Sequence, residues 1–320
     1  MNTLKRFKVI ILITALVVTS GACNRAQNGS YPDNQGTIVI SGAWALYPMM
    51  TRWAEEYQKL HPGVEFDISA GGAGKGMADV LAGAVDIGMV SRDITPQEET
   101  IGAYWIAVTK DAVFPVVNAT NPAVPQMLKK GVLRQTFEGI FITGQITSWG
   151  QVIGDSLMSQ EIHVYTRSDA AGAPETWAKY LGGVQEDLLG VGVFGDPGLL
   201  EAVVRDPLGI GYNNLGYAYD NASGRPVTGA VVVPIDVNEN GRADPEELLE
   251  TKLEAVEMVA KGLYPSPPAR NLNLVTKGTP SSLVRAFIEW ILTGGQYFVG
   301  EAGYVQLGPD QLSAGLTKLR

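Results

Sequence analysis

Residues 236–247 form a twelve-residue segment, DVNENGRADPEE, in which oxygen-bearing side chains recur at regular spacing. Asp and Asn stand at positions 1, 3 and 5, a glycine at position 6 permits a sharp turn, and a glutamate at position 12 can offer both oxygens. This pattern is typical of a Ca²⁺ loop, and it predicts a structural calcium ion. The predicted ligands are Asp236, Asn238, Asn240, Arg242 through its carbonyl, Asp244 and Glu247. The alternative is an acidic turn that caps the next helix without an ion.

Other reactive side chains are scarce. The chain has two histidines, His61 and His163, and one cysteine, Cys23. These numbers exclude a histidine-based zinc site, a Cys/His nucleophile pair and a disulfide framework. No nucleophile–base pair or phosphatase-type metal cluster is visible in the sequence. We therefore expect a protein that is not an enzyme and that has no catalytic cofactor, and we disfavour a hydrolase.

Composition indicates a globular protein of two domains. The chain has 320 residues, of which 45% are apolar and 18% charged, and a single core rarely extends over such a length. Its formal net charge is −9 and its pI is about 4.9. Such a charge opposes general binding to nucleic acid, so we expect no nucleic-acid partner.

The N-terminus has the features of an export signal. Lys5, Arg6 and Lys8 precede the apolar run 9–18, which is too short to span a membrane, and small residues lead to Cys23. This order resembles a bacterial lipoprotein signal, although an ordinary secretory signal with an incidental cysteine is the alternative. We expect residues 1–22 to be a signal peptide, Cys23 to be lipidated, and residues 23–36 to be a flexible tether. The protein would then lie in the periplasm or on the outer face of the cytoplasmic membrane, held by its lipid anchor only.

From Thr37 onward, short apolar runs alternate with segments of helical periodicity. The pattern predicts strands at 37–41, 64–69 and 87–90 and helices at 48–60 and 74–84. Thr95, Pro96 and Glu98 supply an N-cap, a proline at the first helical position and an acid at the third. Alternation of this kind is typical of a parallel sheet with helices on both faces.

The second half of the chain repeats this alternation and then returns to the first domain. An apolar strand at 112–117 leads to a crossover at 118–122. The remaining predictions are helices at 134–143, 174–181, 197–205, 246–261 and 281–292, and strands at 162–166, 210–212, 231–235 and 272–275. We expect one domain from 37–117 plus 221–320, a second from 118–220, and a double hinge around a ligand cleft. The predicted fold class is therefore α/β, with two doubly wound domains.

Several short motifs, in order, resemble those of substrate-binding lipoproteins of ABC transporters, in particular the phosphate-binding proteins. They extend over about residues 37–307. The motifs are SGAWALYP at 41–48, GGAGKG at 71–76, VDIGMVSRD at 85–93, RSDAAGA at 167–173, GIGYNNLGYAY at 209–219 and YPSPPARNLNLVTK at 264–277. The resemblance implies a two-lobed periplasmic-binding-protein fold of type 2.

The same resemblance implies an anion site between the lobes. Glycine-rich turns there lead into helix N-termini, whose free N–H groups and positive dipole end favour an oxyanion, and two arginines can add forked donors. The expected ligand-binding residues are Ala45, Leu46, Gly72, Ala73, Gly74, Ser91, Arg92, Arg167, Asp169, Ala171, Gly172 and Ala173. We expect Arg92 and Arg167 to converge on the ligand, one from each lobe.

Nearly all of the neutral hydroxyls that such a site usually carries are missing. Alanine or tryptophan stands at 43–45, Ala73 interrupts the glycine loop, and 170–173 reads AAGA. Each lost hydrogen bond costs about 1–1.5 kcal/mol. Two interpretations remain open. In the first, backbone N–H groups, the arginines or nearby serines replace the hydroxyls. In the second, the pocket is adapted to a larger or less charged ligand, with Trp44 either in the pocket or packed at the domain surface.

These observations predict a monomeric, lipid-anchored solute receptor that captures phosphate or a related oxyanion and delivers it to the transmembrane subunits of an ABC permease. Two alternatives stay open. The first is the same fold adapted to a phosphonate or a small organic anion. The second is a ligand-sensing lipoprotein without a transport role.

Overall fold

The computed structural model describes residues 35–320, which belong to one compact unit. The predicted signal peptide, Cys23 and most of the tether lie outside the described residues. Within residues 35–320, no helix is long and apolar enough to cross a membrane.

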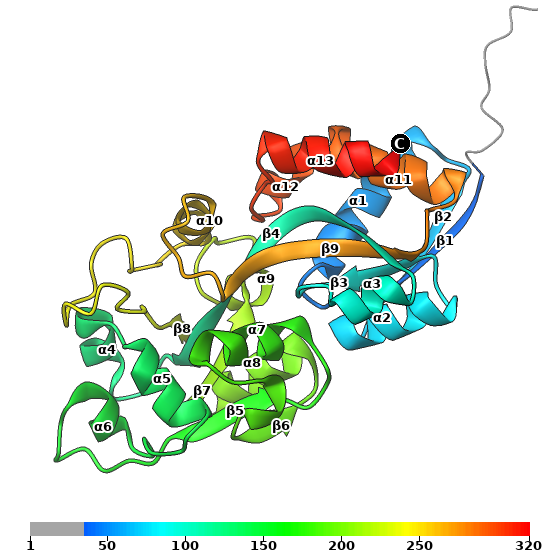
Figure 1. Ribbon diagram of the computed structural model, residues 1–320. Helices are drawn as coiled ribbons and strands as arrows, with labels where there is room; N and C mark the ends of the chain where they lie inside the picture. The colour runs from blue at the N-terminus through cyan, green and yellow to red at the C-terminus, as the bar shows by residue number, and fades with distance from the viewer. Residues whose placement is uncertain (1–34) are drawn as a thin grey trace, which may run out of the picture. The chain divides into compact units, whose positions relative to one another are not determined.

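A nine-stranded mixed sheet organises the chain, in the order β2-β1-β3-β9-β4-β7-β5-β6, with β8 also paired to β4 (Figure 1). The strands are β1 (Gly36–Gly42), β2 (Val64–Ala70), β3 (Ile87–Val90), β4 (Ala103–Asn118), β5 (His163–Arg167), β6 (Val191–Val193), β7 (Gly209–Asn214), β8 (Ala230–Val232) and β9 (Ala269–Lys277). β1 pairs in parallel with β2 and β3, whereas β9 is antiparallel to β3 and β4. The predicted α/β class is confirmed.

The first lobe consists of the elements around β1, β2 and β3, with part of β4 and β9. Its helices are α1 (Tyr47–Leu60), α2 (Ala73–Ala82), α3 (Pro96–Thr100), α11 (Ser282–Leu292), α12 (Tyr297–Glu301) and α13 (Pro309–Leu319), with the 3₁₀ turn η2 (Gly294–Gln296). α1 buries the apolar face that its periodicity predicted, and its Trp53 Nε1 donates to the Gly295 carbonyl at 2.8 Å. This bond ties α1 to the C-terminal helices.

The second lobe surrounds β5, β6, β7 and β8. Its helices are α4 (Val124–Lys130), α5 (Arg134–Phe141), α6 (Trp149–Ile153), α7 (Gly172–Leu181), α8 (Gly195–Arg205), α9 (Leu215–Ala218) and α10 (Lys252–Ala260), with the 3₁₀ turn η1 (Gln185–Asp187). Aromatic side chains fill its centre. Trp177 stacks on Tyr212 at 5.9 Å and meets Phe137 and Phe141 edge-on.

β4 belongs to both lobes. Residues 103–112 pair with β9, and residues 113–117 pair with β7. The two strands β4 and β9 run side by side between the two groups of elements (Figure 1). Each lobe has its own hydrophobic cluster, with the change from one to the other between Val108 and Ala112 of β4. The strand pair β4–β9 therefore connects the two lobes.

The chain re-enters the first lobe later than at residue 221, where we expected it to do so. Val232, Val259 and Tyr264 belong to the hydrophobic cluster of the second lobe. The cause is long-range pairing, because β8 adds to β4 with Val116 opposite Val232. The chain re-enters the first lobe along β9, at Ala269–Lys277.

Candidate functional site

The loops that follow β1 and β2 place the start of α2. The Gly42 carbonyl accepts the N–H groups of Gly71 and Gly72 at 2.9 and 3.0 Å. Gly42 has a φ of 133°, and a Cβ there would lie 2.3 Å from the Met89 carbonyl, so only glycine allows this packing. α2 then begins after Gly72, at the carboxyl end of the parallel strands.

The start of α7 in the second lobe meets the start of α2. The Gly74 N–H donates to the Ala170 carbonyl at 3.1 Å. A Cβ on Gly72 would lie 2.7 Å from that same oxygen, and a Cβ on Gly172 would lie 2.2 Å from the Ser91 carbonyl. Predicted site residues from the two lobes thus lie together, in a closed arrangement with little space between them.

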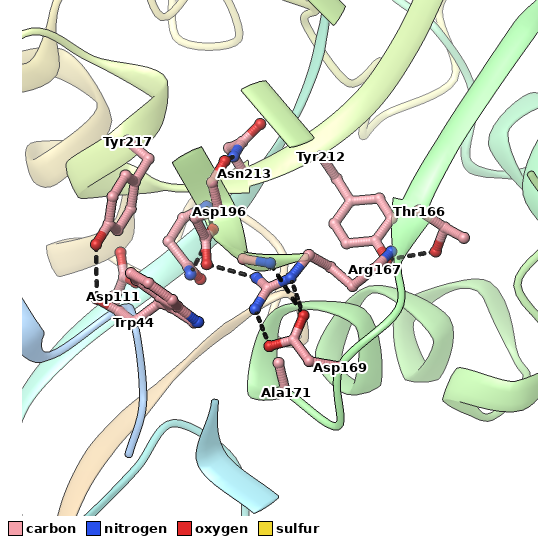
Figure 2. Close-up of polar contacts among 12 residues, drawn as sticks. Trp44, Asp111, Thr166, Arg167, Asp169, Ala171, Asp196, Tyr212, Asn213 and Tyr217 are labelled. Atoms are coloured by element: carbon pink, nitrogen blue, oxygen red, sulfur yellow. Dashed lines mark hydrogen bonds and ion pairs between the residues drawn. The ribbon is translucent and has the colours of Figure 1, made fainter. Parts of the chain in front are cut away.

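Arg167 lies beside this contact and is paired with two carboxylates (Figure 2). Its Nε and Nη2 donate to Asp169 at 2.7 and 2.5 Å, and its Nη1 donates to Asp196 Oδ2 at 2.5 Å. Burial alone would lower the pKa of Arg167, but Asp196 and Asp169 outweigh burial and raise it above its usual range. The guanidinium therefore stays charged, and three of its five N–H groups are already used.

Asp196 was not among the expected site residues. It lies in the first turn of α8 and also accepts the backbone and side-chain N–H groups of Asn214, at 3.2 and 2.8 Å. From the sequence alone, Asp196 is interpreted as an acid that stabilises the start of a helix. No residue near it in the sequence indicates that it pairs with Arg167. Arg167, Asp169 and Asp196 together carry a formal charge of −1.

A second buried arginine, Arg270, joins this cluster to the first lobe. Its Nε donates to the Ser91 carbonyl at 3.0 Å, and its Nη2 donates to Asn214 Oδ1. Its Nη1 is 3.6 Å from Asp111 Oδ2, on the neighbouring strand. Burial raises the pKa of Asp111 to about 6, although Arg270 acts against this shift. Sequence analysis did not single out either residue of this pair.

Arg92 is engaged separately, by two other carboxylates. Its Nη1 and Nη2 donate to Glu98 at 2.9 and 2.6 Å, and its Nε is 3.1 Å from Glu175 Oε2. Hydrogen bonding to Glu98 raises the pKa of Arg92, against the effect of burial. Asp93 pairs with Lys179, and both side chains are more than half exposed. Each of the two expected arginines is thus neutralised by carboxylates of its own.

Four other expected site residues lie in the hydrophobic cores. Ala45, Leu46 and Ala73 belong to the cluster of the first lobe, and Ala173 belongs to that of the second. The Ala45 carbonyl accepts a hydrogen bond from Tyr304 Oη at 2.8 Å.

The comparisons identify the family. The model of the PBP superfamily domain matches residues 29–294. The chain belongs to the PBP superfamily. Among curated proteins, the phosphate-binding protein PstS of Bacillus subtilis is 27% identical, over 67% of this chain and 71% of that protein. PstS of Methanocaldococcus jannaschii is 25% identical, over 97% of this chain and 94% of that protein.

Solved structures of superfamily members share the fold. A Clostridium perfringens structure, described as a phosphate ABC transporter substrate-binding protein with bound phosphate, has a TM-score of 0.69 and 23% identity. The match covers 85% of this chain and 100% of the Clostridium perfringens chain. An ABC-type phosphate transport receptor from Vibrio cholerae has a TM-score of 0.62 and 22% identity, over 84% of this chain and 100% of its own. The predicted two-lobed periplasmic-binding-protein fold is confirmed.

The expected calcium loop of this PBP-superfamily chain is closed by its own hydrogen bonds. Asp236 accepts the N–H groups of Asn240 and Gly241, and Glu247 accepts those of Val237 and Asp244. The side-chain amides of Asn238 and Asn240 both donate to Asp244 Oδ2 at 2.8 Å.

Residues 35–320 contain no group of three or more His, Cys, Asp or Glu side chains that could hold a metal ion. The calcium prediction therefore has no support from the structure. The helix after the loop is also shorter than predicted, because a capping box at Thr251 and Glu254 starts α10 at Lys252.

Proposed function

We propose that this chain is the extracytoplasmic solute-binding protein of an ABC importer, and that it captures phosphate or a related oxyanion between its two lobes. One observation carries the proposal: the N-termini of α2 and α7 meet across the lobes, through Gly74 and Ala170, beside the buried Arg167. Two positive helix ends and a permanent cation form a setting that favours a small anion. The names of the curated relatives support phosphate.

The proposed binding residues are the ones at this contact. The N–H groups of Gly72, Gly74 and Ala171 already donate to Gly42, Ala170 and Gln185. The backbone N–H groups of Ala73, Gly172 and Ala173 would therefore hold the anion, with the N–H groups of Arg167 that Asp169 and Asp196 leave unused. Because Gly172 packs against Ser91 in the closed arrangement, the anion must enter while the lobes are apart. Closure would then remove water and bring donors from both lobes onto one ligand.

The charge around Arg167 favours the alternative of a less charged ligand. Two carboxylates face one guanidinium, so a doubly charged phosphate meets a negative cluster. A monoanion, such as a phosphonate monoester or a small organic acid, meets less repulsion. Both candidates use the same cleft and the same helix ends.

Three further properties belong to this proposal. Residues 1–22 would be removed as a signal peptide, Cys23 would carry the lipid anchor, and the transmembrane subunits of a permease would be the transport partner. The monomer would be the functional form. We also propose, on the sequence pattern of residues 236–247, that the loop holds Ca²⁺ after its asparagine amides turn their oxygens inward.

A calorimetric titration tests the proposal. The body from Gly36 onward, stripped of phosphate, is titrated with inorganic phosphate, methyl methylphosphonate and acetate. We expect one-to-one binding of phosphate, and an affinity at least a hundredfold weaker in Arg167→Gln. Arg205→Gln is the matched control, because Arg205 is an exposed arginine of the same lobe that pairs with Glu201.

Three outcomes are distinct. Phosphate binding that depends on Arg167 and not on Arg205 supports the phosphate receptor. If only the monoanions bind, the ligand is a less charged anion and not phosphate. A folded protein that binds none of the three anions overturns the proposed function.

A further inference from the structure

We propose that the indole N–H of Trp44 is a direct hydrogen-bond donor to the captured anion and takes the place of a missing hydroxyl in the first lobe. This inference rests on the proposed function and adds a specificity-determining residue to the same site. Trp44 stands in the turn before α1, between two alanines that carry no side-chain donor.

The ring of Trp44 packs against the second lobe. It meets Phe194 edge-on, with 6.0 Å between the ring centroids. The Trp44 carbonyl accepts a hydrogen bond from Tyr217 Oη at 3.3 Å (Figure 2). A residue of the first lobe is therefore fixed against two elements of the second.

The nitrogen of the indole lies at the edge of the Arg167 cluster. A Cβ on Gly195 would be 3.2 Å from Trp44 Cε2, the ring carbon bonded to Nε1. The Gly195 N–H in turn donates to Asp169 Oδ1 at 3.1 Å. In Figure 2 the indole nitrogen is at the end of the ring that faces Asp169 and Ala171. The donor thus faces the residues that begin α7.

This N–H is buried and has no hydrogen-bond partner within residues 35–320. Buried donors are almost always satisfied in native proteins, so an unpaired one needs an explanation. Two other tryptophans satisfy theirs, since Trp53 donates to Gly295 and Trp149 donates to Leu208, whereas the Trp177 N–H is also unpaired but lies in the core of the second lobe. A bound oxyanion would supply the missing acceptor.

The chemistry of an indole suits this position. Its N–H only donates, so it needs an acceptor oxygen on the ligand and rejects an ammonium group there. An ionised oxygen accepts this bond more strongly than a hydroxyl oxygen does. It also carries no charge, and so it adds a donor beside Asp169 and Asp196 without disturbing their pairing with Arg167. Trp44 would thus favour ligands that turn an ionised oxygen toward it.

Trp44→Phe tests the inference, because it removes the N–H and keeps an aromatic ring against Phe194. The matched control is Trp177→Phe. The Trp177 Nε1 is also buried without a partner, but its ring lies in the core of the second lobe, against Phe137 and Tyr212. We expect phosphate affinity to fall about tenfold or more in Trp44→Phe and to stay within about twofold of wild type in Trp177→Phe.

A second measurement does not depend on affinity. In ¹H–¹⁵N spectra of wild-type protein, the indole resonance that disappears in Trp44→Phe belongs to Trp44. We expect this resonance to shift on addition of phosphate with the same saturation as the calorimetric titration, and the Trp177 resonance to stay in place. If wild type binds phosphate while Trp44→Phe binds equally well and the Trp44 resonance does not move, the inference is overturned and the proposed function stands. If wild type binds none of the three anions, both fall.

Discussion

Arg167 Nη1 lies 2.5 Å from Asp196 Oδ2, and each of the two side chains is 1% exposed. Arg167 also holds Asp169, whose side chain is 7% exposed, so one guanidinium balances two buried carboxylates. Removing one partner of a buried ion pair leaves a charge with neither water nor counter-ion, which is far more costly than losing a surface pair. Breaking this cluster should therefore destabilise the second lobe, independently of any effect on binding.

Asp196→Asn tests the energetic weight of this pair. We expect the free energy of unfolding in urea at pH 7 to fall by about 3 kcal/mol. One carboxylate oxygen of Asp196 accepts from Arg167 and the other from Asn214, and an amide has only one acceptor oxygen, so one of these buried donors loses its partner. Asp93→Asn is the control. Asp93 pairs with Lys179 at 2.7 Å, but these side chains are 78% and 60% exposed, so we expect a change of at most about 1 kcal/mol. Equal losses in the two variants would contradict the prediction.

Gly172 controls how closely the lobes approach. A Cβ at this position would lie 2.2 Å from both the carbonyl oxygen and Oγ of Ser91. Ser91 is 2% exposed and cannot give way, so Gly172→Ala should prevent full closure. We expect calorimetric affinity for phosphate to fall at least tenfold, while the temperature of unfolding changes by only a few degrees.

The control for this substitution is Gly300→Ala. No atom lies within 4 Å of a Cβ at Gly300, so the change adds a methyl group without a clash. Wild-type affinity in Gly172→Ala would show that binding does not need the contact between α7 and Ser91.

Local patterns were enough to predict most elements of the fold. The strand at Ile87–Val90 matches its predicted bounds. The capping box of α3 is also present, with Thr95 Oγ1 accepting the Glu98 N–H at 3.2 Å and Glu98 accepting the Thr95 N–H at 2.8 Å. These features depend on residues a few positions apart, and the sequence displays them directly.

Contacts between distant residues account for what could not be predicted. The same Glu98 that caps α3 also binds Arg92, and Asp196 binds Arg167 from 29 positions away. No spacing rule connects these residues, because the fold alone brings them together. The later return to the first lobe has the same origin, since β8 pairs with β4 across more than a hundred positions. The start of α10, in contrast, had a visible signal in Thr251 and Glu254.

Calcium can be tested by its effect on stability. If the loop binds the ion as weakly as extracellular modules do, 10 mM Ca²⁺ should raise the free energy of unfolding by about 1.4–2.7 kcal/mol relative to excess chelator. Glu247→Gln should abolish this gain, because it removes the carboxylate at position 12. Glu246→Gln, one residue earlier and outside the predicted ligand set, is the matched control. A gain of zero in wild type would mean that the hydrogen bonds to Asp236, Asp244 and Glu247 close the loop without an ion.

Asp111 should make stability depend on pH. The side chain is fully buried on β4, and burial raises its pKa from 3.8 to about 6, against the attraction of Arg270. A carboxyl group with a raised pKa binds its proton more tightly in the folded state than in the unfolded chain. Its contribution to stability is therefore complete below about pH 4 and is lost as the pH rises to about 6. The loss amounts to about 3 kcal/mol.

Asp111→Asn isolates this contribution. Urea unfolding of wild type and variant between pH 4 and pH 7 gives the difference in free energy at each pH. We expect wild type to lose about 3 kcal/mol relative to the variant across that range, whatever the absolute stability of the variant, since the amide does not titrate. Parallel curves would mean that Asp111 stays ionised down to pH 4. In that case Arg270, 3.6 Å away, would offset the effect of burial completely.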